Sequence, residues 1–167
     1  MGYRDFIKID GRMKKFWLII IGSFLALFII IQFFQPEKND NLINPQNDIV
    51  FKLEMPTMVK KKFADACYDC HSNKTKYPVY NRVAPVSWLL AKHIRDGKEH
   101  LNFSEWANYD KKKQIKLLTA ICEEITSGEM PMKGYVFMHS KAIINEKELE
   151  EICLWTEQAA EQVMSQP

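Results

Sequence analysis

Residues 67–71 read Cys-Tyr-Asp-Cys-His (CYDCH), and this short stretch decides most of what the sequence predicts about the fold. The pattern C-x-x-C-H is the attachment signal for c-type haem. Two cysteines about one helical turn apart reach the two vinyl groups of one porphyrin as thioethers, and the next residue places its imidazole under the iron. The stretch therefore predicts one covalently bound haem c per chain, held by Cys67 and Cys70, with His71 as an iron ligand.

Three other kinds of site use similar residues, and each lacks a feature in the rest of the chain. A structural zinc site takes four Cys or His ligands, commonly as two close pairs, whereas Cys122 and Cys153 stand singly. A thioredoxin-like dithiol lies beside a βαβ pattern, and no strand pattern precedes residue 67. A disulfide within the motif suits an exported chain but leaves His71 unexplained. The pattern favours haem.

An uncharged apolar run from Phe16 to Phe34 precedes the motif. At 1.5 Å per residue such a helix spans about 28 Å, which matches the hydrocarbon layer of a bilayer. Basic residues precede the run, and by the positive-inside rule they place the N-terminus in the cytoplasm and the following domain outside. A cleaved signal peptide has a shorter apolar core and a small-residue cleavage site, so a retained anchor is favoured.

This organisation predicts a single-pass protein of the bacterial cytoplasmic membrane with a periplasmic domain. The expected segments are a cytoplasmic stretch (1–15), a membrane span (16–34), a polar linker (35–51) and a haem domain (52–167). Residues 1–35 carry a formal charge of +3 and the whole chain +2, so the exported part is nearly neutral at −1. Such a charge gives no reason to expect a nucleic-acid partner.

Helical periodicity predicts four or five helices after the linker, and no segment alternates as a strand does. We expect the first helix from residue 56 or 57 to about residue 70, and another from residue 87 to about residue 100. Ser104 is expected to cap a short turn and Asp110 the helix that follows it. The predicted domain is all-α.

The last helix has the clearest start, because Asn145 is followed three residues later by Glu148, a capping-box pair. Its apolar stripe includes Trp155, which we expect to pack in the core with Phe63 of the first helix. Cys122 and Cys153 fall on apolar helical positions, where either buried free thiols or a disulfide are expected.

Two longer stretches carry a resemblance to a known family: CYDCHSNKTKYPVYNRVAPVSWLLAKHIRDGKEHLNFSEWANY and GEMPMKGYVFMHSKAIINEKELEEICLW. They resemble the haem-binding domain family of bacterial cytochrome c-like proteins over about residues 52–163. The resemblance implies a cytochrome c-like helical fold with covalent haem. It implies little about a partner or a reaction.

The second axial ligand of the iron is expected from the segment between the last two helices. A thioether or a second imidazole completes the coordination, and Met130, followed by Pro131, is the predicted ligand. Met132 and His139 are the alternatives for the ligand, and core packing is the alternative role for Met130. Cytochromes c generally bond the proximal histidine to a proline carbonyl, and Pro85 is the candidate here, with a simple loop break as the other interpretation.

Residues that follow the motif are candidates for bonding the haem propionates. Arg82 suits a carboxylate, and Tyr80 and Trp88 each bring one donor; ordinary loop packing is the alternative for each. With both axial positions filled by protein, the predicted function is electron transfer between redox partners of the membrane or periplasm, without a catalytic residue. The alternative is a haem-based sensor or a peroxidase-like protein whose sixth ligand is labile or absent.

Overall fold

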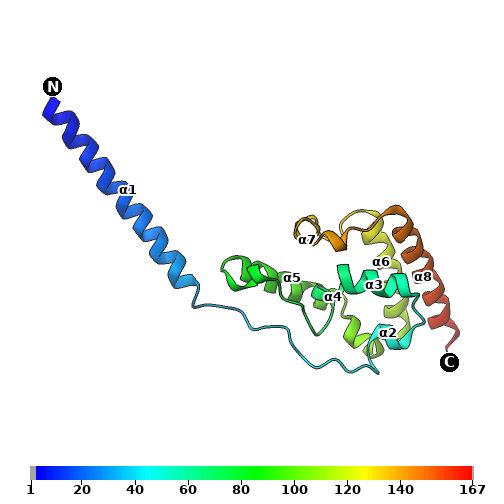
Figure 1. Cartoon of the computed structure of the whole chain (residues 1–167). Coiled ribbons are helices and arrows are strands. Elements are labelled where there is room, and N and C mark those ends of the chain that lie inside the picture. Colours follow the sequence, from blue (N-terminus) through cyan, green and yellow to red (C-terminus); the bar gives the residue numbers. More distant parts are fainter. Residues whose placement is uncertain (1–2, 167) are drawn as a thin grey trace. The chain divides into compact units, whose positions relative to one another are not determined.

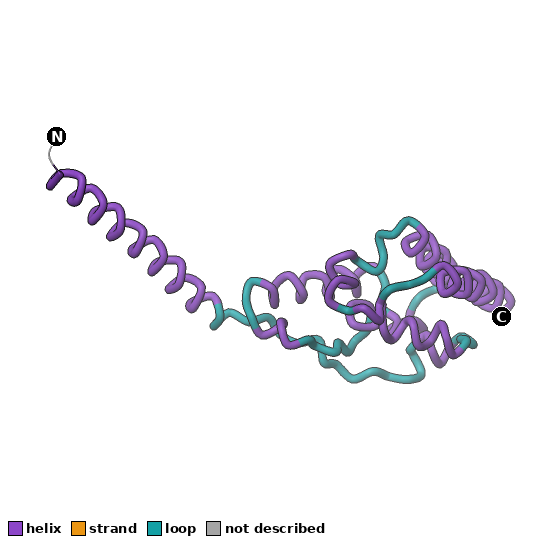
Figure 2. Tube along the Cα trace, turned by 45° about the horizontal axis from the view of Figure 1, so that its top comes forward, coloured by secondary structure: helices purple, strands orange, loops and turns teal. Residues whose placement is uncertain are grey.

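The computed structural model describes residues 3–166, and the side chains from residue 11 onward. Their contacts divide the chain into two units, one of residues 3–37 and 78–91 and the other of residues 38–77 and 92–166 (Figure 1). Helices and loops make up both units, and no β-strand occurs between residues 3 and 166 (Figure 2). The all-α prediction is confirmed.

The first unit contains α1 (Tyr3–Ile31), the 3₁₀ turn η1 (Val79–Arg82) and the first residues of α5 (Val86–His100). Gly11–Ile31 of α1 is 21 residues long and unburied, is uncharged from Phe16 onward, and is long and apolar enough to cross a membrane. Signal sequences share this property. The helix ends at Ile31, three residues before the expected end of the span.

The second unit is a helical domain. Its elements, besides the end of α5, are α2 (Ile49–Lys52), α3 (Thr57–Ala66), α4 (Tyr68–His71), η2 (Phe103–Asn108), α6 (Lys111–Thr126), α7 (Lys133–Met138), η3 (Ser140–Ala142) and α8 (Glu146–Ser165).

Phe63 lies at the centre of the domain core and joins α3 to α8. Its ring centroid is 5.2 Å from that of Phe103 and 5.3 Å from that of Trp155, the latter in an edge-to-face arrangement. All three side chains are buried. The Trp155 indole N–H donates to the carbonyl of Glu54 at 2.8 Å, so this large apolar ring is buried without an unpaired donor. The expected packing of Phe63 with Trp155 is confirmed.

The helix starts follow local capping rules at two of the three predicted positions. The Asp110 carboxylate accepts from the Lys113 amide at 2.7 Å, and Asn145 and Glu148 form the complete capping box. Ser104 does not cap its turn. Asn102 does, because its side-chain oxygen accepts from the Ser104 amide at 3.1 Å, and an Asn one residue before the turn satisfies the N-cap geometry.

A disulfide between Cys122 and Cys153 joins α6 to α8, with their Cα atoms 5.0 Å apart. The two helices pack against each other side by side (Figure 1). This bond decides between the two states that the sequence left open for these cysteines.

Lys62 is a buried cation that ties α3 to the start of α8. Its ammonium donates to the carbonyls of Lys141 and Ile143 at 3.2 and 2.8 Å and pairs with the Glu148 carboxylate at 2.9 Å. Burial of Glu148 raises its pKa, but hydrogen bonds from the Asn145 amide and Lys62 outweigh burial and bring the pKa below its usual value. The charged pair is thereby fully hydrogen-bonded.

The expected linker packs onto the domain from Asn39 onward. The Asn41 amide donates to the Asn73 carbonyl at 2.9 Å and the Thr75 amide to the Asn39 carbonyl at 3.0 Å. Asp48 and Ile49 are buried, and Asp48 caps the short helix α2. This stretch has the polar composition of a linker, but the structure shows it as an ordered segment packed on the domain.

Candidate haem site

Cys67 interrupts the helix that the sequence predicts to continue through the motif. Its φ of −122° ends α3, while its amide still donates to the Phe63 carbonyl at 2.9 Å. A new turn, α4, then begins, with the amides of Cys70 and His71 donating to the Cys67 carbonyl at 3.2 and 3.0 Å. Neither motif cysteine is in a disulfide and both are half-buried. The motif is thus a separate turn that presents two thiols and an imidazole.

The His71 ring is oriented by the carbonyl of Leu101, at 2.9 Å from Nδ1. A carbonyl only accepts, so Nδ1 carries the proton and Nε2 holds the lone pair that binds a metal. The prediction that Pro85 supplies this carbonyl is wrong. The Pro85 carbonyl accepts from the amides of Trp88 and Leu89 in the first turn of α5, at 3.1 and 3.2 Å. The Leu101 carbonyl follows the end of α5, where carbonyls lack helical partners.

Burial also sets the protonation of the three motif side chains. Desolvation lowers the pKa of His71, and backbone hydrogen bonds to Leu101 and Gly97 oppose this only in part. The imidazole is therefore neutral at pH 7, which is the form that ligates iron. Burial raises the pKa of Cys67 to about 12, and the neighbouring Cys70 raises it further. Burial raises the pKa of Cys70 to about 11, and the charge of Asp69 adds to this increase. Both sulfurs are protonated thiols.

Gly97 lets α5 approach the motif closely. A Cβ at this position would lie 2.9 Å from the carbonyl oxygen of Cys70 and 3.4 Å from its carbonyl carbon. Such contacts are shorter than side chains tolerate, and the neighbouring atoms are backbone. Glycine is therefore required for the packing that also brings Leu101 to His71.

The two residues between the cysteines hold the motif in place. The Tyr68 hydroxyl donates to the buried Asp48 carboxylate at 2.7 Å, and its ring stacks on Phe103 at 5.1 Å. Asp69 accepts from the Tyr135 hydroxyl at 2.8 Å and from the Lys76 amide at 3.0 Å. Sequence reasoning missed these partners, because nothing local marks pairs that lie 20 and 66 residues apart.

The predicted sixth ligand and its rivals lie in the same unit as the motif. Met130 follows α6, and its amide donates to the Glu124 carbonyl at 3.0 Å. Met132 precedes α7, and His139 follows it, with its ring stacked on that of Tyr135 at 4.1 Å. Met130 is 36% exposed, and its role as ligand or as core filler stays a prediction.

The candidates for propionate binding lie in the first unit. The single donor of Trp88 is used by the Phe34 carbonyl, at 2.5 Å. A propionate bond from Trp88 would have to replace this one, since indole offers no second N–H, and the propionate role of Trp88 stays a prediction. Tyr80 and Arg82 belong to η1, with Arg82 exposed, and their propionate role stays a prediction.

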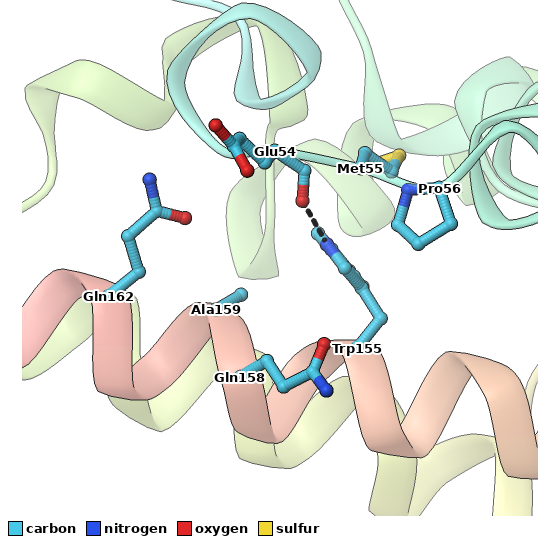
Figure 3. Close-up of a pocket in the computed structure, with 7 residues that line it drawn as sticks. All are labelled: Glu54, Met55, Pro56, Trp155, Gln158, Ala159 and Gln162. Atoms are coloured by element: carbon cyan, nitrogen blue, oxygen red, sulfur yellow. Dashed lines mark hydrogen bonds between the residues drawn. The ribbon is translucent and has the colours of Figure 1, made fainter.

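Residues 11–166 contain no group of three or more His, Cys, Asp or Glu side chains that could hold a metal ion. A haem requires only its axial ligands from the chain, whereas a zinc site would need four, and the disulfide occupies Cys122 and Cys153. A groove of about 630 Å³ lies on α8, away from the motif (Figure 3). It is lined by Glu54, Met55, Pro56, Trp155, Gln158, Ala159 and Gln162.

A model of the haem-binding domain matches residues 26–158, which is 133 of the 167 residues. The chain belongs to the haem-binding domain family. The match covers the motif and all three candidates for the sixth ligand, and it begins upstream of the expected domain, within α1. No curated protein and no solved structure matches the chain.

This member of the haem-binding domain family has side chains that suit the cofactor. Two protonated, unbridged thiols lie three residues apart, and the next residue is a neutral histidine with an oriented ring. The family membership makes the chain a haem-binding protein. Cys67, Cys70 and His71 are the residues that would hold the haem.

Proposed function

We propose that this chain is a membrane-anchored c-type cytochrome that carries one covalently attached haem and transfers electrons. The observation that carries the proposal is the state of the motif: two thiols outside any disulfide, and a histidine whose Nδ1 is bonded to the Leu101 carbonyl. On this proposal Cys67 and Cys70 form the thioethers and His71 is the proximal ligand.

A bound haem supplies one-electron exchange at its iron. The chain itself would hold the haem and orient the side chain that ligates its iron. The Leu101 carbonyl fixes the His71 tautomer and ring plane, and such an outer partner also makes the ligand more basic. Phe103 packs against the ring at a centroid distance of 5.9 Å, and Gly97 keeps α5 close enough for the Leu101 contact.

The position of Met130 supports its assignment as the sixth ligand. It follows α6, is 36% exposed and is not one of the side chains that form the hydrophobic core of the domain. Tyr135 links the segment that carries Met130 to Asp69 inside the motif. Filled axial positions leave no open site for a substrate, which favours electron transfer over an enzyme.

The anchoring part of the proposal rests on α1. Its apolar stretch is unburied and long enough to span a bilayer, and basic side chains precede it, which favours a cytoplasmic N-terminus and a periplasmic domain. The expected partners are redox proteins of the membrane or periplasm.

Covalent attachment is tested by denaturing the purified full-length protein and extracting it with acidified organic solvent. Haem is expected to stay with the polypeptide. In Cys67→Ser or Cys70→Ser one thioether is lost, so the reduced pyridine complex shifts its absorption to longer wavelength. Haem that leaves the wild-type chain on extraction would refute covalent attachment while leaving haem binding intact.

The sixth ligand and the reaction class are tested by absorption spectra with and without carbon monoxide. The ferric protein should show a sulfur-to-iron charge-transfer band that Met130→Leu abolishes and Met138→Leu keeps; Met138 is a matched control, since it is 55% exposed on the same segment. If the charge-transfer band survives in Met130→Leu, Met130 is not the sixth ligand. Rapid carbon monoxide binding by the wild type would favour the sensor or peroxidase-like alternative.

A further inference from the structure

Two sets of hydrogen bonds tie the end of α1 to residues 84–88 within the first unit. The Gln32 side-chain amide pairs with both backbone groups of Ala84: its Oε1 accepts from the amide at 2.9 Å and its Nε2 donates to the carbonyl at 3.2 Å. The Trp88 indole donates to the Phe34 carbonyl at 2.5 Å. Residues about fifty positions apart in sequence are thus held together where the apolar helix ends.

The length of α1 sets the depth of these bonds in a bilayer. The uncharged stretch Phe16–Phe34 has 19 residues, which at 1.5 Å per residue is about 28 Å, close to the hydrocarbon thickness of a membrane. Gln32 lies in the last turn of this stretch and therefore close to the level of the lipid headgroups. Ala84 shares that depth because Gln32 bonds to it directly.

Large apolar side chains around these bonds are exposed. Phe33 and Val79 are 82% and 83% exposed, and Val83 and Trp88 are 43% and 39% exposed. Val83 is the direct neighbour of Ala84 in the chain, and Phe33 follows Gln32. Exposed aromatic and apolar side chains that sit at the headgroup level are typical of membrane interfaces.

We propose that residues 79–88 form a second contact with the membrane, in which Val79, Val83 and Trp88 lie in the lipid headgroup layer beside the end of α1. The proposal rests on the anchoring role proposed for α1. Arg82 is exposed in the same turn, and its long basic side chain is of the kind that reaches lipid phosphates at interfaces. The lipid bilayer is the occupant, because the bonds from Gln32 and to Phe34 bring these residues to the end of the span.

The test uses the full-length, haem-loaded protein in phospholipid vesicles that contain a phospholipid with a diazirine near its headgroup. After illumination, labelled peptides are mapped by mass spectrometry. Label is expected at the two ends of the span, which lie at headgroup depth, and in residues 79–88. The double variant Val79→Asp and Val83→Asp should reduce label in residues 79–88 at least fivefold and leave the span labelled. The matched control is Leu42→Asp with Phe51→Asp, which places the same charges on exposed apolar positions of the other unit.

Each other outcome overturns the inference in a recognisable way. Label in the span alone overturns the second contact and leaves the anchor standing, whereas label in neither segment overturns both. Label in residues 79–88 that the aspartates do not reduce shows that these side chains do not make the contact. Loss of haem absorbance with unchanged labelling would assign Val79 and Val83 to the wall of the haem site instead.

Discussion

Gly97→Ala is the sharpest test of how α5 packs on α4, the turn that carries the C-x-x-C-H motif. In a helix interior, alanine is favoured over glycine by about 1 kcal/mol. Here the added methyl would meet the Cys70 carbonyl oxygen at 2.9 Å and its carbonyl carbon at 3.4 Å. Overpacking of this kind costs about 1–3 kcal/mol, and the atoms met are backbone, which moves least, so the upper half of that range applies.

The expected net result is a loss of about 1–2 kcal/mol in the free energy of unfolding, or roughly 4–8 °C in Tm for a domain of this size. The assay is thermal unfolding of the full-length chain in detergent, followed by the fluorescence of Trp106 and Trp155, both buried in the core. Because Leu101 is on the helix end that would move, the same variant should also weaken its bond to His71.

Gly134→Ala is the matched control. Gly134 is also helical, and a Cβ there meets nothing within 4 Å, so this variant should keep or raise the Tm. If Gly97→Ala is as stable as Gly134→Ala, the close approach of α5 to the Cys70 backbone is refuted, and with it the reason given for the position of Leu101.

Three further predictions concern the rest of the domain. Replacing Cys122 and Cys153 by serine should lower stability by about 4 kcal/mol, from the chain entropy of the loop the disulfide closes, while haem stays attached; denaturant unfolding and a haem-stained gel check this, and detached haem would contradict it. Tyr68→Phe leaves the buried Asp48 carboxylate without one donor and should cost about 1–3 kcal/mol in the same assay; an unchanged unfolding midpoint would count against that bond. The depressed pKa of Glu148 contributes stability above its unfolded pKa near 4.5, and this is lost as pH falls through the folded value. Glu148→Gln should therefore be less stable at pH 7, with the difference shrinking below about pH 4.5; a difference that stays constant down to pH 3 would contradict it.

Local rules predicted those parts of the fold whose partners are close in sequence. Asp110 and the Asn145–Glu148 pair cap their helices because donor and acceptor are three residues apart, so the residue types alone identify the bond. The end of α3 at Cys67 has no local sequence signal, since neither glycine nor proline occurs at that position. The short helix α2 was missed because its surroundings have a linker composition.

In the candidate site, too, the features that depend on nearby residues were predicted, and those that depend on distant residues were missed. The C-x-x-C-H spacing identified the residues proposed to hold haem, but the acceptor for His71 is 30 residues away and depends on where α5 ends against the motif. Pro85 was the wrong choice because its carbonyl is already used in the first turn of that helix. Family membership confirms haem binding, while the sixth ligand remains the prediction that the spectra test.

The disulfide between α6 and α8 also limits which cysteines can pair with one another. Four cysteines allow three complete pairings, and in an oxidising compartment a bridge between Cys67 and Cys70 would consume the thiols that haem attachment requires. Packing of α6 on α8 brings one pair to a Cα separation of 5.0 Å, so folding of the core selects which thiols are oxidised. The helical core thereby keeps Cys122 and Cys153 from pairing with either cysteine of the motif.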